Sequence, residues 1–340
     1  MIIGTSAYSD ADVNLMKQAG ITHLRQGFGY PWAKTAGGEP AERYVNARAA
    51  AVGRREQGFE LMGITPLFGH GVREPVGPGG KLELVWKPST PAWMGEYGSD
   101  EFIENYEMVC RFLAEQTRGV VDLWQIANEL DLNLFAGPLK PAGACELILA
   151  AARGLKAGNP DCTVGHNCAG TEMAYFFCGR LFADADTPLD YCGIDGYYGT
   201  WDSGGPNSWA GRIAELYELT GKPVLINEWG YSSAGGVMTQ DEAASEPWPC
   251  ELKKWRFGWD GGHTPQVQAE FVRQAFAAFR QHREKLMGLF FYRWEDQAKC
   301  WQCGQPDCPA ETAWGLVDRN NRPKPAWQAF AAGVRELRET

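Results

Sequence analysis

The chain has 340 residues, of which 44% are hydrophobic and 22% charged, a balance typical of globular proteins with a large core. Its formal net charge of -10 and its pI near 5.1 argue against nucleic-acid partners, which require clustered lysine and arginine. No basic segment followed by an apolar stretch is visible at the start, which predicts a cytoplasmic protein, or a secreted one if a leader has been removed. Its apolar stretches are far shorter than the roughly 20 residues that cross a bilayer, so we expect no membrane partner, while the oligomeric state stays open.

Eight short apolar or β-branched segments alternate with helical patterns along the chain. This alternation predicts repeated βα units and a parallel sheet. The predicted strands lie near residues 1 to 5, 21 to 27, 59 to 68, 121 to 127, 162 to 167, 190 to 197, 223 to 228 and 286 to 293. Because eight strands are the number of a closed (β/α)8 TIM barrel, and no linker divides the sequence, we predict a single α/β catalytic domain over residues 1–340.

Helix signals and long insertions lie between these strands. One helix is predicted from near Asp10 to Gly20, another after Ser99 and a third over 265–283, each with apolar residues spaced for one buried face. Insertions rich in Gly, Pro and Trp follow the third and seventh strands, at 71–98 and 230–264, and a polar loop follows the eighth. Loops that follow strands lie on the carboxyl face of a barrel, where barrel enzymes build their sites.

Two glutamates come directly after predicted strands. The fourth strand leads into Asn128 and Glu129, and the seventh ends at Glu228. Cleavage of a glycosidic bond with retention needs one protonated and one ionised carboxyl, about 5–5.5 Å apart. Each glutamate alone is also explained as a helix cap or an ion-pair partner, but the pair, at the ends of strands four and seven, favours catalysis.

With Asn128-Glu129 after strand four and Glu228 after strand seven, the whole chain resembles the clan A retaining glycoside hydrolases, which include family 5 glycanases and family 39 glycosidases. The resemblance implies that Glu129 is the general acid/base and Glu228 the nucleophile of a β-glycoside hydrolase. Such an enzyme cleaves β-linked oligo- or polysaccharides by double displacement without a catalytic cofactor.

The resemblance also implies sugar-site roles for further strand-end residues: Arg25, His70, Asn128, Tyr197, Trp294, Asp195 and Glu295. It places Arg25 beside the nucleophile to hold it ionised, and the Tyr197 hydroxyl against the nucleophile. By the same resemblance, we expect His70 to bind a sugar hydroxyl, Asn128 to donate to the sugar 2-hydroxyl, and Trp294 to form a ring platform beneath the sugar.

Two of these positions leave alternatives open. Asp195 stands where family 5 enzymes usually have His in a His-x-Tyr pattern, so it is either a sugar ligand or a carboxylate that structures the loop. Glu295 and Asp296 either accept hydrogen bonds from sugar hydroxyls or form a loop salt bridge with Arg293 or Lys299.

Nine of the ten cysteines fall into two groups. Buried, inert thiols are predicted among apolar residues at Cys110, Cys145, Cys162, Cys178 and Cys192. Cys300, Cys303 and Cys308 instead share a polar loop, and Cys250 lies in the other long loop. The sequence leaves three alternatives open for these four cysteines: they bind a structural zinc ion, form disulfides or remain free thiols.

Two rival functions use the same barrel. A transglycosylase would pass the glycosyl unit to a sugar acceptor with the same two carboxyls. A non-catalytic carbohydrate-binding barrel would keep aromatic platforms but lack a carboxylate, and both carboxylates are present in this chain. Sugar and linkage preference, and endo or exo action, depend on loop shapes that the sequence does not determine.

Overall fold

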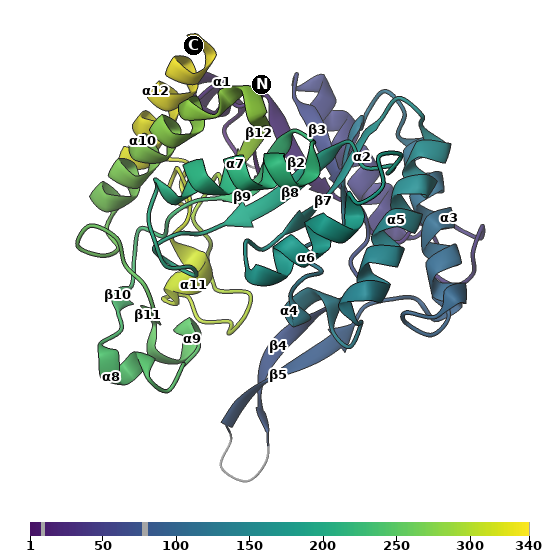
Figure 1. Cartoon of the computed structure of the whole chain (residues 1–340), viewed down its shortest axis with the longest axis horizontal. Helices are drawn as coiled ribbons and strands as arrows, with labels where there is room; N and C mark the ends of the chain where they lie inside the picture. Colours follow the sequence, from purple (N-terminus) through teal and green to yellow (C-terminus); the bar gives the residue numbers. More distant parts are fainter. Residues whose placement is uncertain (8–10, 77–80, 340) are drawn as a thin grey trace. The chain divides into compact units, whose positions relative to one another are not determined.

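In the computed structural model, which describes residues 1–7, 11–76 and 81–339, eight parallel strands form a closed barrel in the order β1-β12-β9-β8-β7-β6-β3-β2 (Figure 1). The barrel strands are β1 (Ile2–Thr5), β2 (His23–Gly27), β3 (Glu60–Ile64), β6 (Leu123–Ile126), β7 (Thr163–Cys168), β8 (Tyr191–Gly196), β9 (Val224–Trp229) and β12 (Leu286–Phe291). Each predicted strand overlaps one of them. The prediction of a (β/α)8 TIM barrel is therefore confirmed.

Helices follow the barrel strands and also occupy the insertions. They are α1 (Val13–Gln18), α2 (Glu42–Glu56), η1 (Ala92–Met94), α3 (Asp100–Gln116), α4 (Asn133–Ala136), α5 (Pro141–Gly158), α6 (Glu172–Leu181), α7 (Ser208–Thr220), α8 (Gln240–Ala243), α9 (Pro249–Leu252), α10 (Pro265–Gln281), η2 (Arg283–Lys285), α11 (Pro309–Thr312) and α12 (Pro325–Glu339). The predicted helices after Ser99 and over 265–283 correspond to α3 and α10, and the side chains of Ser99 and Thr264 cap them by accepting the backbone N–H of the third helical residue. Asp12 caps α1, and the predicted start at Asp10 lies outside the described residues.

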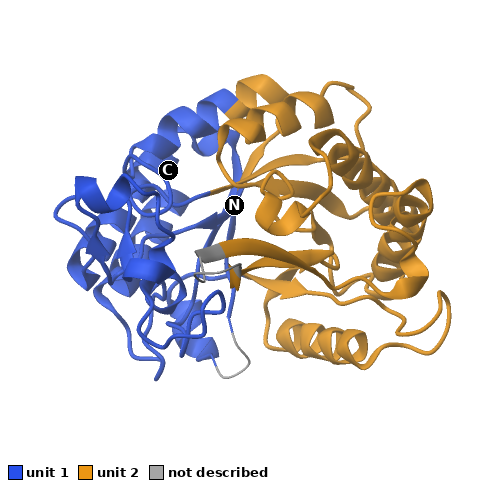
Figure 2. Ribbon diagram, turned by 90° about the horizontal axis from the view of Figure 1, so that it is seen from below, with its two compact units in different colours: residues 1–22, 196–215, 226–340 blue, residues 23–195, 216–225 orange. Residues whose placement is uncertain are grey.

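The chain divides into two compact units (Figure 2). One contains residues 1–22, 196–215 and 226–340, with β1, β12 and most of β9. The other contains residues 23–195 and 216–225, with β2, β3, β6, β7 and most of β8. Because neither unit holds all eight barrel strands, neither is a complete (β/α)8 domain by itself.

In the unit that contains β6, helices α3 and α5 pack through two glycines. A Cβ atom added at Gly154 would lie 2.2 Å from the carbonyl oxygen of Glu107, and one added at Gly158 would lie 2.2 Å from that of Arg111. Real side chains cannot approach a backbone so closely. The two glycines therefore let α5 lie directly against the backbone of α3.

In the other unit, α10 and α12 lie side by side (Figure 1). Their apolar faces are buried, with Phe276 and Phe330 in contact at 5.4 Å between ring centroids. Gly333 of α12 provides the close approach, since a Cβ there would lie 2.3 Å from the Phe276 ring. This packing fixes the last helix of the chain onto the helix that precedes β12.

The insertion predicted at 71–98 as a Gly-, Pro- and Trp-rich loop contains an antiparallel hairpin. Its strands are β4 (Gly69–Val76) and β5 (Lys81–Pro88), and its tip, residues 77–80, lies outside the described residues. The predicted third strand, 59 to 68, was too long, because β3 ends at Ile64. The second insertion, 230–264, carries α8, α9 and a short parallel pair, β10 (Gly236–Val237) with β11 (Lys254–Trp255). Among the described residues no helix is both long enough and apolar enough to cross a membrane.

Candidate functional site

A network of polar side chains surrounds the carboxyl end of β6. Asn128 donates from its side-chain amide to Glu129 Oε2 at 3.2 Å. Arg25, at the centre of β2, donates to Gln125 Oε1 at 2.9 Å and to Asn128 Oδ1 at 3.4 Å. Gln125 in turn donates to Asn128 Oδ1 at 3.2 Å. The fold thus brings three of the predicted site residues, Arg25, Asn128 and Glu129, into one hydrogen-bonded group.

The backbone of this strand end adopts a conformation that L-residues rarely populate. Ala127 has a φ of 50° and Glu129 a φ of 41°, both in the left-handed region. Such residues cost of order 1–3 kcal/mol each and cluster at functional sites, where the surrounding structure holds them in place. Here the Ala127 N–H donates to Thr65 Oγ1 at 2.8 Å and the Glu129 N–H donates to Asn167 Oδ1 at 3.3 Å. The strained turn therefore fixes the direction of the Glu129 side chain.

Asn167, near the end of β7, connects this network to Asp195. Its amide donates to Asn128 Oδ1 at 3.0 Å and to Asp195 Oδ2 at 2.5 Å. Asp195 is completely buried, and this contact gives it a role in orienting Asn167. The sequence interpretation missed Asn167 and Gln125, although each is a side-chain amide within a predicted strand.

Asp131 holds the segment after Glu129 to the loop that follows β7. Its carboxylate accepts from the Ala169 N–H at 3.1 and 3.0 Å and from the Thr171 hydroxyl at 3.4 Å. Burial raises the pKa of Asp131 from 3.8 to about 6 in spite of these hydrogen bonds. The folded protein therefore holds this carboxyl group at a position where burial disfavours its ionised form.

His70 lies on β4 of the β4–β5 hairpin. It is exposed and pairs in register with Lys87 of β5. The prediction that it binds a sugar hydroxyl is untested by these contacts.

In the unit that contains β9, the hydroxyl of Tyr197 donates a hydrogen bond to Glu228 Oε2. Glu228 is partly exposed at the end of β9, and Tyr197 directly follows β8. The Tyr197 ring meets Tyr292 edge-on at 5.7 Å and Trp314 at 5.0 Å. The rings of Tyr292 and Trp314 therefore hold the phenol of Tyr197, whose hydroxyl contacts Glu228.

The remaining predicted residues, Trp294, Glu295 and Asp296, lie in the segment that follows β12. Trp294 is fully buried, so its role as a ring platform stays a prediction. Glu295 is also buried, with its backbone bridged to Val317, and both of its proposed roles stay open. Asp296 accepts from Lys324 Nζ at 2.9 and 3.2 Å, so it forms a loop salt bridge as one alternative expected, but with a different partner.

The four loop cysteines come together in this same unit. The ligand sulfurs of Cys250, Cys300, Cys303 and Cys308 all lie within 4.8 Å of one another, and Cys300 and Cys308 are buried. The hydrogen bonds among these thiols lower the pKa of Cys308 and raise that of Cys250, so the cluster favours a single thiolate when no metal is bound. Thiolates are the form of cysteine that binds metals, and the cluster is compact enough for all four to bind one metal ion.

The cysteines predicted to be inert are buried free thiols, and the cluster cysteines are also unlinked. Burial raises the pKa of Cys110 well above its ordinary value and that of Cys145 to about 12. Cys168, which the sequence interpretation did not consider, is buried in β7. Raised pKa values keep the thiols of Cys110 and Cys145 protonated, and protonated thiols are poor nucleophiles.

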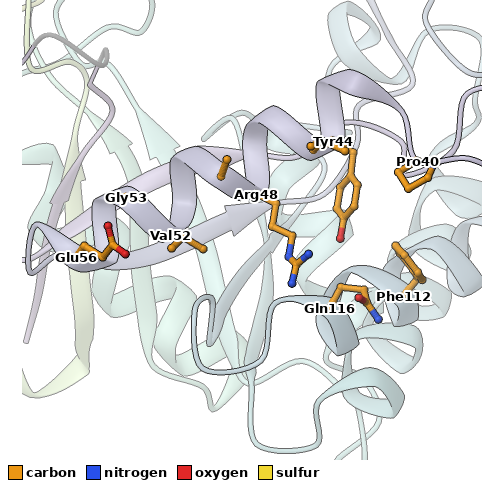
Figure 3. A pocket seen from close by; sticks show the side chains of 10 residues that line it. Pro40, Tyr44, Arg48, Val52, Gly53, Glu56, Phe112 and Gln116 are labelled. Carbon is orange, nitrogen blue, oxygen red and sulfur yellow. The ribbon is translucent and has the colours of Figure 1, made fainter.

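An open groove of about 510 Å³ lies elsewhere, between α2 and α3 (Figure 3). Tyr44, Arg48 and Val52 of α2 face Phe112 and Gln116 of α3 across it. None of the predicted site residues lines this groove. Its mostly apolar lining lacks the paired carboxyls that glycoside cleavage needs.

Comparison by sequence finds no matching family model and no matching curated protein. Comparison by structure finds barrels of glycoside hydrolases. A family 39 glycoside hydrolase from the gut symbiont Bacteroides cellulosilyticus WH2 matches with a TM-score of 0.63 at 16% identity over 98% of this chain and 63% of that one. The exo-β-1,4-mannosidase Op5Man5 from Opitutaceae bacterium strain TAV5 matches with a TM-score of 0.64 at 14% identity, over 100% and 60%.

The catalytic domain of a GH53 protein from Ignisphaera aggregans matches with a TM-score of 0.61 at 19% identity, over 94% of this chain and 87% of that domain. The chain covers less than two thirds of the length of the first two proteins. The chain therefore shares its fold with the catalytic barrels of clan A glycoside hydrolases, at low sequence identity.

Proposed function

We propose that this protein is a retaining β-glycoside hydrolase. Glu228 attacks the anomeric carbon while Glu129 protonates the leaving glycosidic oxygen, which gives a covalent glycosyl ester on Glu228. Glu129 then removes a proton from water, and the resulting hydroxide attacks the same carbon and releases Glu228 as a carboxylate. The two inversions leave the β configuration unchanged.

The observation that carries this proposal is the position of the two glutamates in the barrel. Glu129 follows β6 and Glu228 is the second-last residue of β9, and two strands, β7 and β8, separate β6 from β9 in the barrel order. Active sites of (β/α)8 enzymes are built at the carboxyl ends of the strands. The strained turn at Glu129 and the phenol that contacts Glu228 support the same assignment.

The proposal requires a particular separation between the carboxyl groups of Glu129 and Glu228, which belong to different units of the chain. A retaining mechanism needs the two carboxyl groups about 5–5.5 Å apart, whereas an inverting one needs about 6.5–9.5 Å. A crystal structure with a bound sugar measures this separation directly. A separation in the longer range would replace double displacement with single displacement.

Azide rescue of alanine variants distinguishes the acid/base role of Glu129 from the nucleophile role of Glu228. In Glu129→Ala, azide should accept the glycosyl group from the intermediate and give a β-glycosyl azide, and aryl glycosides with acidic phenols should lose least activity. In Glu228→Ala, azide should attack the substrate directly and give the α-glycosyl azide. Glu218→Gln, at an exposed position of α7, is the matched control and should behave as wild type.

Screening aryl β-glycosides and β-glucans with wild type and Glu228→Gln tests the activity itself. Loss of a covalent nucleophile should reduce kcat by on the order of 10⁴-fold or more. Full activity in Glu228→Gln would refute the assignment. Products that contain a transferred sugar in place of free sugar would favour the transglycosylase, and no turnover of any glycoside would favour the carbohydrate-binding barrel.

We also propose that the four-cysteine cluster binds one structural zinc ion. Closed sets of four cysteines are typical structural zinc ligands, and the sulfurs lie within 4.8 Å of one another. Protein purified under reducing conditions should carry about one zinc per chain by elemental analysis, and Cys303→Ser should carry less. Metal-free protein with all ten thiols titratable after denaturation would support free thiols instead, and fewer titratable thiols would support disulfides.

A further inference from the structure

The four cysteines join two segments that lie far apart in the sequence. Cys250 lies on α9, between β9 and α10, whereas the other three lie between β12 and α12. The sulfur of Cys250 is 3.9 Å from that of Cys300 and 3.6 Å from that of Cys308. A metal bound by all four would cross-link the two segments, since each segment supplies at least one ligand.

A path of hydrogen bonds begins between two of these cysteines. Gln302 lies in the Cys300–Cys303 turn, accepts from the Trp248 indole at 2.6 Å and donates to Glu311 at 2.7 Å. Glu311, on α11, is buried and also accepts from the Tyr292 hydroxyl at 2.9 Å. The segment that carries three of the four thiols thus also holds the hydroxyl of Tyr292.

Tyr292 continues the path to the candidate nucleophile through ring contacts. Its ring meets the Tyr197 ring edge-on at 78°, with 5.7 Å between centroids. Trp314 packs against both rings, at 5.0 Å from Tyr197 and 5.9 Å from Tyr292. Tyr197 then donates its hydroxyl hydrogen to Glu228. All of these residues and the four cysteines belong to one unit of the chain.

We propose that the metal site positions the nucleophile. The bound metal fixes Gln302 and Glu311, which hold Tyr292, and Tyr292 keeps the Tyr197 hydroxyl directed at Glu228. This inference rests on the proposed hydrolase function for its kinetic consequence. Because the path ends at the nucleophile and not at a sugar-binding group, its disruption should lower kcat and leave KM nearly unchanged.

The first test breaks the path while keeping all four thiols. Gln302→Ala removes the amide between Trp248 and Glu311, and Gln305→Ala, an exposed glutamine of the same loop, is the matched control. Both variants should retain the zinc content of wild type. Removal of a hydrogen bond to a buried carboxyl should lower kcat of Gln302→Ala about 10-fold with KM within about twofold, while Gln305→Ala stays at the wild-type value. A wild-type kcat in Gln302→Ala would overturn the proposal.

The second test does not use activity. Zinc is removed with 1,10-phenanthroline under reducing conditions, and hydrogen–deuterium exchange is followed in peptides that contain Tyr197 and Glu228. We expect faster exchange in both peptides, reversed when zinc is added back. An increase confined to residues 300–311 would overturn the proposal and leave a purely local structural site.

The two tests also separate this inference from the proposed function. If wild type cleaves no glycoside but exchange around Glu228 still follows zinc loading, the hydrolase proposal fails and the coupling stands. If the enzyme cleaves glycosides and Gln302→Ala is unaffected, the coupling fails and the hydrolase proposal stands. Should zinc removal unfold the protein, the kinetics of the zinc-loaded Gln302→Ala variant decide.

Discussion

The buried carboxyl of Asp131 predicts a stability difference that depends on pH. Burial raises its pKa from 3.8 to about 6 in the folded protein. The folded protein therefore binds this proton more tightly than the unfolded chain, and the free energy of unfolding should fall as pH rises from about 4 to about 6. A rise of the Asp131 pKa from 3.8 to about 6 corresponds to at most about 3 kcal/mol in the free energy of unfolding. This stabilisation of the folded protein is present at low pH and is lost by neutral pH.

Asp131→Asn tests this expectation, because asparagine keeps the shape and the oxygen that accepts from Ala169 but carries no charge. The variant should match wild type near pH 4 and be more stable by up to about 3 kcal/mol near pH 7.5. Urea unfolding midpoints measured across this pH range give the difference, with Asp161→Asn, an exposed aspartate of the same unit, as control. A difference that is independent of pH, or that grows as pH falls, would refute the reasoning.

Three other outcomes are expected. Tyr197→Phe removes a hydrogen bond to a charged group that contributes about 1.5–3 kcal/mol, so steady-state kinetics should give a kcat roughly 10- to 100-fold lower with a similar KM, and an unchanged kcat would dismiss the contact as incidental. The wild-type rate should depend on pH as a bell, because one carboxyl must begin protonated and the other ionised, and a flat profile from about pH 4 to 9 would contradict this. Gly158→Ala should destabilise the protein by about 1–3 kcal/mol in urea unfolding, since its Cβ would lie 2.2 Å from the Arg111 carbonyl oxygen. Gly179→Ala, where no atom lies within 4 Å of the added Cβ, should be neutral or slightly stabilising, and equal effects at the two glycines would show that packing is not the cause.

The barrel was predictable because its signals are local. Most barrel strands are short, largely apolar and buried segments, as at β6 and β8, and helices carry their own caps, as at Ser99. The second strand is the exception, since β2 contains His23, Arg25 and Gln26. The β4–β5 hairpin was missed because Gly and Pro around its tip obscured the alternation in Lys81–Trp86. A period-two pattern over those residues was the signal that indicated a strand.

The candidate site was only partly predictable, for a physical reason. Glu129 and Glu228 were found because a polar residue directly after an apolar strand stands out in the sequence. Gln125 and Asn167 were missed because their partners come from other strands, at β2 and β6, and such pairings depend on strand order. The four cysteines could be grouped by spacing, but the path from Gln302 through Glu311 joins side chains that only the folded loops bring together.

The different environments of the two glutamates bear on which role each takes. Glu129 is held by amides: Asn128 donates to its side chain, and Asn167 accepts from its backbone N–H. The Asn128 amide has a fixed orientation, because its Oδ1 accepts from Arg25, Gln125 and Asn167 and its nitrogen therefore faces Glu129. Glu228 instead accepts a hydrogen bond from the hydroxyl of Tyr197, which is held among aromatic rings. A fixed donor suits a group that must attack as a carboxylate, because a hydrogen bond to the charged form favours that form. The Tyr197 contact is consistent with the proposed nucleophile role of Glu228, and the two azide products distinguish the proposed assignment from its reverse.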